Sequence, residues 1–187
     1  MDIKRINFTG AQGTGKTSVL KALQQDPEFA EFEFVTEVVR NFVKEKGITI
    51  NKQGTPETQE VLFEAYENVL SKQNSYVSDR CIIDVCAYTA SGRNAAMSNI
   101  DKWIELEQKQ EKEIIQRKSE LGLVCYFPIE FEIVADGVRS IDKEYQKEID
   151  GKIHQILHSN LISHLIMHGS VEERVKAIKA ILFKPVK

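Results

Sequence analysis

A glycine-rich segment near the start of the chain carries a lysine and a hydroxyl side chain. The segment has the pattern Gly-x-x-x-x-Gly-Lys-Thr, in which backbone N–H groups can converge on phosphate oxygens. In such a loop Lys16 neutralises phosphate charge, and the hydroxyl of Thr17 is a ligand for Mg²⁺. The pattern therefore predicts a site for ATP and Mg²⁺. The residues of this site are Gly10, Gln12, Gly13, Thr14, Gly15, Lys16, Thr17 and Ser18.

Three acidic side chains stand where a catalytic carboxylate is expected. Ligands of parallel α/β sheets bind beyond the carboxyl ends of the strands, which is where Glu37 and Asp79 fall. Asp79 is predicted to hold Mg²⁺ together with Thr17 or to take a proton from an acceptor hydroxyl, and Glu37 to act as base or acceptor ligand. Asp84 competes for these roles, because residues 81–84 could themselves be a strand ending in the metal-binding carboxylate. The choice of base among the three side chains stays open at this point.

Arginines near these carboxylates could recognise phosphate groups. Arg80 can bind a phosphate with two hydrogen bonds, and Arg40 stands one helical turn beyond Glu37. Arg139 follows a glycine in a polar segment, so residues 136–150 are predicted to form a lid that brings this cation onto the transferring phosphoryl group. The expected catalytic residues are Lys16, Glu37, Asp79 and Arg139, and the expected acceptor-binding residues are Glu37, Arg40, Arg80 and Asp84.

Alternating apolar runs and amphipathic segments must position these residues. Short apolar runs predict strands, and apolar residues three or four apart predict helices. Thr55 and Pro56 predict a helix start, and Gly47 a helix end. The alternation predicts a parallel sheet covered on both faces. The predicted strands are residues 3–9, 32–36, 76–78, 123–127 and 164–167. The predicted helices are residues 16–25, 38–46, 55–70, a segment carrying Ile83, Ala87 and Tyr88, and residues 101–120, 149–157 and 171–183. The apolar face of the helix at 101–120 is predicted to consist of Trp103, Leu106, Ile114 and Ile115. Residues 91–98 are predicted to form a loop.

The overall composition is that of a folded soluble protein. The chain has 187 residues, 42% of them hydrophobic and 28% charged, which suits one domain over residues 1–187. A net charge of −3 and a pI near 5.9 provide no general basic field, and so disfavour nucleic acid as a partner. The first residues lack the apolar core of a signal peptide, and no apolar run approaches the length of a membrane span. A cytoplasmic protein without membrane contact is therefore expected.

Cysteines and histidines offer no further site in this sequence. The three cysteines lack the CxxC spacing and are predicted to be buried free thiols in a reducing compartment. Two histidine pairs invite a metal interpretation, but no HExxH pattern or cysteine pair accompanies them, so no metal other than nucleotide-bound Mg²⁺ is expected. These residues are Cys81, Cys86 and Cys125, and His154, His158, His164 and His168.

Several short motifs occur in an order that is typical of one kinase family. The motifs are residues 10–17, Glu37-Val38-Val39-Arg40, Thr55-Pro56-Glu57-Thr58-Gln59, Asp79-Arg80 with Asp84 and Tyr88, Asp136-Gly137-Val138-Arg139, and Gly169-Ser170-Val171-Glu172-Glu173-Arg174. In this order the sequence resembles the NadR-type AAA-domain P-loop kinase family, which is related to ribosylnicotinamide kinase and to nucleoside and nucleotide kinases. The resemblance implies a three-layer P-loop fold with a five-stranded parallel sheet and a lid. It also implies that Glu37 and Asp79 line the acceptor pocket, that Arg139 belongs to the lid, and that the loop at residues 169–170 lies near the adenine.

These observations predict an ATP- and Mg²⁺-dependent phosphotransferase that moves the γ-phosphoryl group of ATP to a nucleoside- or nucleotide-like small molecule. A deoxynucleoside monophosphate kinase is an alternative, because Arg40, Arg80 and Arg93 could bind an acceptor phosphate. A kinase acting on modified DNA bases and a nucleotide-dependent switch without an acceptor are further alternatives. The sequence lacks the guanine motif Asn-Lys-x-Asp, which favours ATP over GTP. The oligomeric state stays open, a homodimer included.

Overall fold

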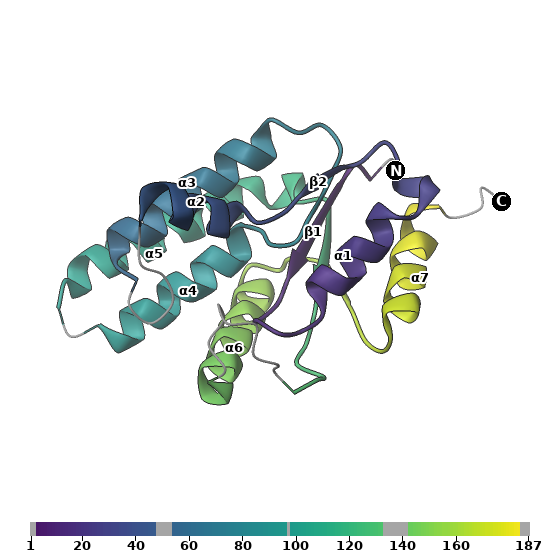
Figure 1. Ribbon diagram of the computed structural model, residues 1–187. Coiled ribbons are helices and arrows are strands. Elements are labelled where there is room, and N and C mark those ends of the chain that lie inside the picture. The colour runs from purple at the N-terminus through teal and green to yellow at the C-terminus, as the bar shows by residue number, and fades with distance from the viewer. Residues whose placement is uncertain (1–2, 48–53, 97, 133–141, 184–187) are drawn as a thin grey trace.

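The computed structural model describes residues 3–47, 54–96, 98–132 and 142–183. Its five strands form one parallel sheet, as predicted, and their order in the sheet is β2-β3-β1-β4-β5 (Figure 1). The strands are β1 (Arg5–Thr9), β2 (Glu33–Val35), β3 (Tyr76–Ser78), β4 (Leu123–Tyr126) and β5 (His164–Ile166). The helices are α1 (Lys16–Gln24), α2 (Val38–Lys46), α3 (Pro56–Ser71), α4 (Ile82–Ala95), α5 (Ile100–Arg117), α6 (Lys143–Ser159) and α7 (Val171–Leu182), with short 3₁₀ turns at Pro27–Phe29 and Lys118–Glu120.

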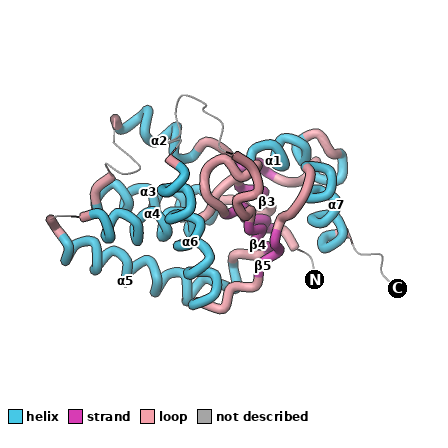
Figure 2. Tube along the Cα trace, turned by 90° about the horizontal axis from the view of Figure 1, so that it is seen from below, coloured by secondary structure: helices cyan, strands magenta, loops and turns pink. Residues whose placement is uncertain are grey.

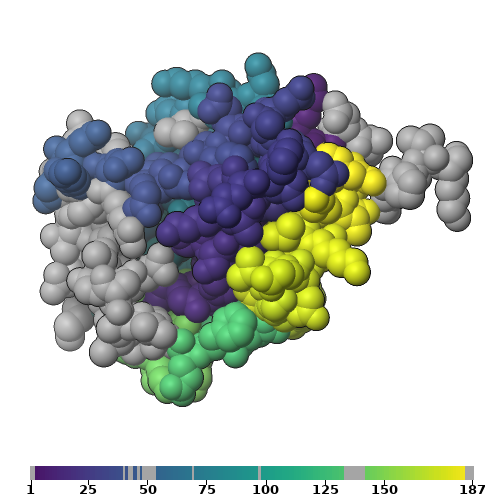
Figure 3. Space-filling model, turned by 45° about the vertical axis from the view of Figure 1, so that its right-hand side comes forward, coloured from purple at the N-terminus to yellow at the C-terminus, as the bar shows by residue number. Residues whose placement is uncertain are grey.

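The sheet lies between two layers of helices, because the side chains of its strands alternate between its faces. In β1, Ile6 and Phe8 pack with α1 and α7, while Asn7 and Thr9 point to the other face. Figures 1 and 2 show α1 and α7 on one side of the strands and α3, α4, α5 and α6 on the other. Figure 3 shows α7, in yellow, beside the purple segment that contains α1. The fold is therefore a three-layer α/β arrangement.

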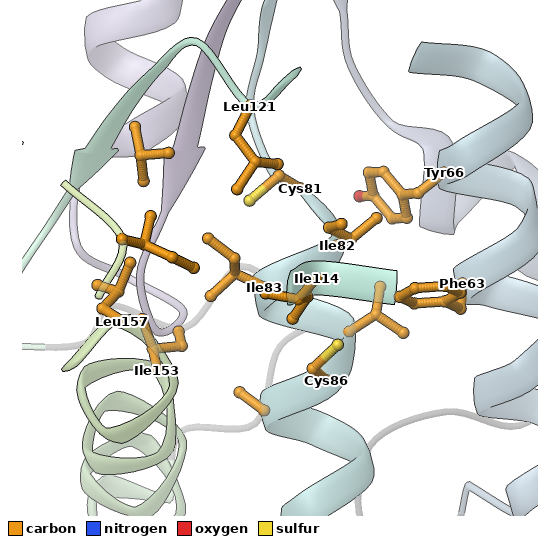
Figure 4. Packing of buried hydrophobic residues seen from close by; sticks show 14 of the residues in the cluster. Phe63, Tyr66, Cys81, Ile82, Ile83, Cys86, Ile114, Leu121, Ile153 and Leu157 are labelled. Carbon is orange, nitrogen blue, oxygen red and sulfur yellow. The ribbon is translucent and has the colours of Figure 1, made fainter. Parts of the chain in front are cut away.

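The larger hydrophobic cluster holds the helices α3 to α6 on one face of the sheet (Figure 4). Ile83 of α4 is fully buried between Ile153 of α6 and Ile114 of α5. Full burial of one such side chain contributes about 1.5–3 kcal/mol to stability. Because α4 starts directly after β3, this packing fixes the direction in which the polar residues between β3 and α4 point.

The segment predicted as a loop at residues 91–98 is mostly helical. Helix α4 continues to Ala95, and Ser91 is buried in its last turns. Gly92 lies directly under the ring of Trp103 on α5, where an added Cβ would come within 2.4 Å of the indole. Tertiary packing against α5 therefore overrides the weak helix propensity of the small and polar residues here.

Two other sequence predictions differ from the structure on the same side of the sheet. Residues 81–84 are not a strand, since Cys81 caps α4 and the helix begins at Ile82. Ile115 was expected on the buried face of α5, but it is 52% exposed. The buried face of that helix consists of Trp103, Leu106, Gln110 and Ile114.

The remaining helices follow the sequence signals closely. Thr55 caps α3 by accepting the backbone N–H of Thr58 at 3.2 Å, as the Thr-Pro pattern predicts. Helix α6 begins at Lys143, earlier than expected, because Asp142 caps it. Residues 143–150 of the predicted lid therefore belong to α6, and residues 136–141 lie outside the described residues.

The cysteines lie in the interior of the protein. The three thiols are buried and unbridged, as predicted: Cys81, Cys86 and Cys125. Burial raises the pKa of all three thiols, so they remain protonated at neutral pH. Within the described part of the chain, no helix combines the length and the apolar character that crossing a bilayer requires.

Candidate functional site

The glycine-rich segment forms a loop that wraps around the side chain of Lys16. The Nζ atom of Lys16 donates to the backbone oxygens of Gly10 and Ala11 at 2.6 Å each, and to Oγ1 of Thr14 at 3.2 Å. Only 7% of Lys16 is exposed, although it carries an ammonium group. The loop thus holds a buried cation at the start of α1, where the helix dipole also favours an anion.

Glycine is required at two positions of this loop. Gly10 has φ 152°, and a Cβ there would lie 2.5 Å from the backbone oxygen of Phe127. Gly15 has φ 88° and caps α1, and a Cβ there would lie 2.9 Å from Arg174. Only a residue without a side chain fits both the conformation and the space at these positions. The missing side chains let Phe127 and Arg174 pack directly against the backbone of the loop.

Helix α4 is tied to the loop by a buried carboxylate. Asp84 is 1% exposed and accepts the backbone N–H of Gly10 at 3.4 Å and that of Cys81 at 3.1 Å. It also pairs with Arg80 at 3.2 Å. Asp84 is not among the described residues that line the cavity over the loop. These contacts give Asp84 a structural position behind the site.

Asp79 and Glu37 follow two neighbouring strands, β3 and β2. The backbone N–H of Asp79 donates to Val35 at 3.1 Å, which ties the ends of the two strands together. Burial raises the pKa of Asp79; the positive charges of Arg80 and Lys16 oppose this shift, and the negative charge of Glu37 adds to it. The charges of Lys16 and Glu37 therefore both act on the carboxylate of Asp79.

The backbone of Glu37 adopts a conformation that non-glycine residues rarely take. Its φ is 60°, and its carbonyl accepts the N–H of Asn41 at 2.8 Å, which starts α2. The left-handed region costs a non-glycine residue about 1–2 kcal/mol. Such strain at the end of a strand is typical of functional positions, so Glu37 is a candidate on structural grounds as well.

A cavity of about 340 Å³ lies over the loop and joins it to the end of β3. Asp79 and Arg80, which follow β3, line the cavity together with Phe131, Gly169 and Arg174. The volume falls at the lower end of the range of small-molecule sites. The described residues that line the cavity are Gly13, Thr14, Gly15, Lys16, Thr17, Ser18, Asp79, Arg80, Phe131, Glu132, Gly169, Val171 and Arg174.

Thr17 and Asp79 line the same cavity, and both provide oxygen atoms. Hydroxyl and carboxylate oxygens are ligands that Mg²⁺ prefers, so this pair fits the predicted metal. Elsewhere, no cluster of three or more histidine, cysteine or acidic side chains within the described residues could hold a metal ion. The histidines at 154, 158 and 164 instead form ring contacts with one another.

Two of the arginines expected to bind an acceptor phosphate, Arg80 and Arg93, have acidic partners. Arg80 pairs with Asp84, and Arg93 pairs with Glu107 at 2.6 Å. Arg40 lies in α2, and its side chain is outside the described part of the structure. Arg139 lies outside the described residues, so its position over the phosphates stays a prediction.

Helix α6 contributes residues that sequence reasoning did not select. Gln146 is 3% exposed and donates to the backbone oxygen of Gln12 at 2.6 Å. Gln12 itself is 4% exposed, and its side chain accepts the hydroxyl of Tyr88 at 3.2 Å. Asp150 accepts the hydroxyl of Tyr126 at 3.0 Å. Burial raises the pKa of Asp150, against this hydrogen bond and the nearby positive charges, and no local pattern marks these residues in the sequence.

Helix α7 contributes Arg174, which the sequence marks only as the last residue of the motif at residues 169–174. Arg174 is 1% exposed, donates to the backbone oxygen of Thr14 at 2.8 Å and pairs with Glu130 at 2.6 Å. One signal could have found it, because Arg174 occupies a core position of the amphipathic helix, between Val171 and Ile178. A cation at such a position requires a buried partner.

Comparisons with known proteins agree with this fold. No curated protein matches the chain. Two solved structures of NadR, one in complex with NR and one with NAD and AMP-PNP, superpose with TM-scores of 0.76 and 0.70 at 16% and 15% identity. They cover 98% of this chain, and the chain spans about half of theirs, 53% and 51%. Deoxyadenosine kinase from M. mycoides with bound dCTP superposes with a TM-score of 0.65 at 14% identity, over 96% of this chain and 98% of that one.

These similarities show a common fold, in which the phosphate loop occupies the start of the first helix. The family described as AAA domain matches residues 5–174, which include the loop, both strand-end carboxylates and Arg174. The chain therefore belongs to the AAA-domain family of P-loop proteins, with the fold of NadR and deoxyadenosine kinase.

Proposed function

We propose that this protein is an ATP- and Mg²⁺-dependent kinase that phosphorylates a hydroxyl group of a nucleoside-like small molecule. The observation that carries this proposal is the cavity that joins the phosphate loop to Asp79 and Arg80 at the end of β3. A phosphoryl donor on the loop and an acceptor at the strand ends would meet there. Phosphoryl transfer requires little covalent chemistry from the protein beyond such positioning and charge stabilisation.

In the proposed reaction an acceptor oxygen attacks the γ-phosphorus of ATP, the bond to the β-phosphate oxygen breaks, and ADP leaves. Lys16 would stabilise the charge on the phosphates, and Glu37 or Asp79 would take the proton of the acceptor hydroxyl. Mg²⁺ held by Thr17 and Asp79 would supply further neutralisation of phosphate charge. If Asp79 serves the metal in this way, Glu37 is left as the base. Glu37 is not among the described residues that line the cavity, so what supports this role is its charge acting on Asp79 and its strained backbone.

A neutral nucleoside fits the site better than a nucleoside monophosphate. An acceptor phosphate requires cations that are available to it. Among the described residues, Arg80 and Arg93 are already paired with Asp84 and Glu107. The NadR structure in complex with NR and the deoxyadenosine kinase structure support the same class of acceptor.

The proposal is tested by ATP turnover with magnesium across a panel of acceptors. The panel contains deoxynucleosides, ribonucleosides, nicotinamide riboside, deoxynucleoside monophosphates and DNA. Lys16→Ala is the inactive reference, and Lys21→Ala is the matched control, because Lys21 is an exposed lysine on the same helix. We expect strong stimulation by one nucleoside in the wild type and in Lys21→Ala, and none in Lys16→Ala.

Each other outcome selects another function. Stimulation only by monophosphates would identify a nucleotide kinase, and stimulation only by DNA would identify a kinase acting on bases in DNA. Tight ATP binding with no stimulation by any acceptor would contradict the kinase proposal and indicate a nucleotide-dependent switch.

A further inference from the structure

An arginine from the end of the chain is buried behind the phosphate loop. Arg174 is 1% exposed, and one guanidinium nitrogen donates to the backbone oxygen of Thr14 at 2.8 Å. Its guanidinium carbon lies 5.3 Å from the ring centre of Phe127 and 5.2 Å from that of Phe131. Since so little of its surface is exposed, Arg174 can act on a bound molecule mainly through the groups that it contacts.

Glu130 holds the guanidinium in place from the other side. Its Oε2 atom accepts from Arg174 at 2.6 Å and from the backbone N–H of Gly169 at 3.0 Å, and Oε1 bonds to His168 at 2.6 Å. Although burial opposes it, the bonds from His168 and Arg174 lower the pKa of Glu130. Glu130 is therefore ionised at neutral pH, and it fixes Arg174 with a charge-assisted hydrogen bond.

The bond to Thr14 determines how one peptide group of the loop is turned. In a trans peptide the carbonyl and the N–H of the following residue point in opposite directions. Because the carbonyl of Thr14 points to Arg174, the N–H of Gly15 points away from it. Gly15 has φ 88° and no side chain, so its own conformational preference does not hold this peptide in one orientation.

We propose that Arg174 is a positioning residue, which directs the N–H of Gly15 toward the phosphates of the nucleotide bound in the loop. This inference rests on the proposed nucleotide site. It assigns the arginine of α7 to the phosphate end of the cavity, not to the part lined by Gly169 and Val171. The planar guanidinium is required, because two different nitrogens, at two positions, bond Thr14 and Glu130, and the single nitrogen of a lysine side chain cannot stand at both positions.

The test compares the binding of ADP and of pyrophosphate by calorimetry. Pyrophosphate carries the phosphates alone, so it reports on the loop without the base. Arg174→Lys keeps the charge and loses the fork, while Arg174→Met removes both. The control is Lys179→Met, which breaks an ion pair of the same helix with Asp26 at 2.7 Å, remote from the loop.

We expect Arg174→Lys to raise the dissociation constants of ADP and of pyrophosphate by the same factor, about tenfold or more. This is the size of effect that the loss of a hydrogen bond to a charged group produces. Lys179→Met is expected to lower the melting temperature and to leave both dissociation constants unchanged. If Arg174→Met does not fold, the binding measurements on Arg174→Lys alone test the positioning role.

Unchanged binding of both molecules in Arg174→Lys would overturn the inference and leave the kinase proposal intact. A loss for ADP without a loss for pyrophosphate would also overturn it, because the arginine would then act on the base end of the cavity. A wild-type protein that binds neither molecule would instead contradict the proposed nucleotide site itself.

Discussion

Asp84 of α4 accepts the backbone N–H of Gly10 at 3.4 Å, although 74 residues separate the two. The same carboxylate pairs with Arg80, which lines the cavity. One buried side chain thus connects the first glycine of the loop to a cation that lines the cavity.

Asp84→Asn is expected to destabilise the protein by about 2–3 kcal/mol, because it removes the carboxylate that forms an ion pair with the largely buried Arg80. Urea unfolding measures this loss. Glu120→Gln is the control, since its ion pairs with Arg5 and Arg117 are on the surface and should contribute less than about 1 kcal/mol. Equal losses in the two variants would show that the buried ion pair contributes no more to the free energy of unfolding than the surface pairs do.

Glu37→Gly should separate stability from activity. Glycine accepts φ 60° without strain, which gains up to about 1 kcal/mol after the larger entropy of the unfolded glycine is subtracted. Turnover should fall by about 100-fold or more in Glu37→Gly and in Glu37→Gln, because both lose the carboxylate. Activity of either variant within about tenfold of the wild type would exclude Glu37 as the base.

Asp79→Asn should be more stable than the wild type at neutral pH, and inactive. The folded protein raises the pKa of Asp79 above its ordinary value of 3.8, so the native state binds more protons than the unfolded state as pH rises past that value. Ionised Asp79 therefore destabilises the fold, and asparagine removes this penalty. The difference in unfolding free energy should shrink as pH falls through the raised pKa of the folded state and should vanish below about 3.8, which urea titrations at several pH values measure. A wild type more stable than Asp79→Asn at pH 7 would contradict the sign of the shift.

The same shift affects the rate if ionised Asp79 is required for turnover. The acid limb of the kcat/KM profile should then lie above pH 3.8, because the carboxylate is harder to ionise in the site. A profile of kcat/KM against pH at limiting Mg²⁺ measures this limb, because Mg²⁺ bound at Asp79 would itself lower the pKa. A rate that stays constant down to pH 4 would argue against a catalytic role for the ionised side chain.

Gly92→Ala should destabilise the protein by about 1–3 kcal/mol, because the added methyl group meets the ring of Trp103. Gly151→Ala is the matched control. It also lies inside a helix, but nothing is within 4 Å of the added Cβ, so it should stabilise by about 0.5–1 kcal/mol. Thermal unfolding of the two variants should therefore shift in opposite directions, and equal shifts would show that α4 and α5 separate easily.

Local features of the chain could be predicted from the sequence alone. The phosphate loop is contiguous, and its glycines, lysine and threonine act through the backbone of one turn, so residues 10–17 predict it without knowledge of the fold. The cap at Thr55 and the strand-end position of Asp79 are equally local. The order of strands and helices, and hence a parallel sheet with two covered faces, followed from hydrophobic periodicity.

The tertiary structure alone decided which distant residues support the loop. Arg174 reaches Thr14 across 160 residues, and Gln146 reaches Gln12 across 134. Sequence periodicity marks which face of a helix is buried, but it does not say which element that face meets. The sheet order β2-β3-β1-β4-β5 and the packing of α7 on α1 and of α4 on α6 determine which elements are in contact. For the same reason Asp84 could be assigned to the back of the site only once α4 was placed, since its role depends on the backbone N–H groups that surround it.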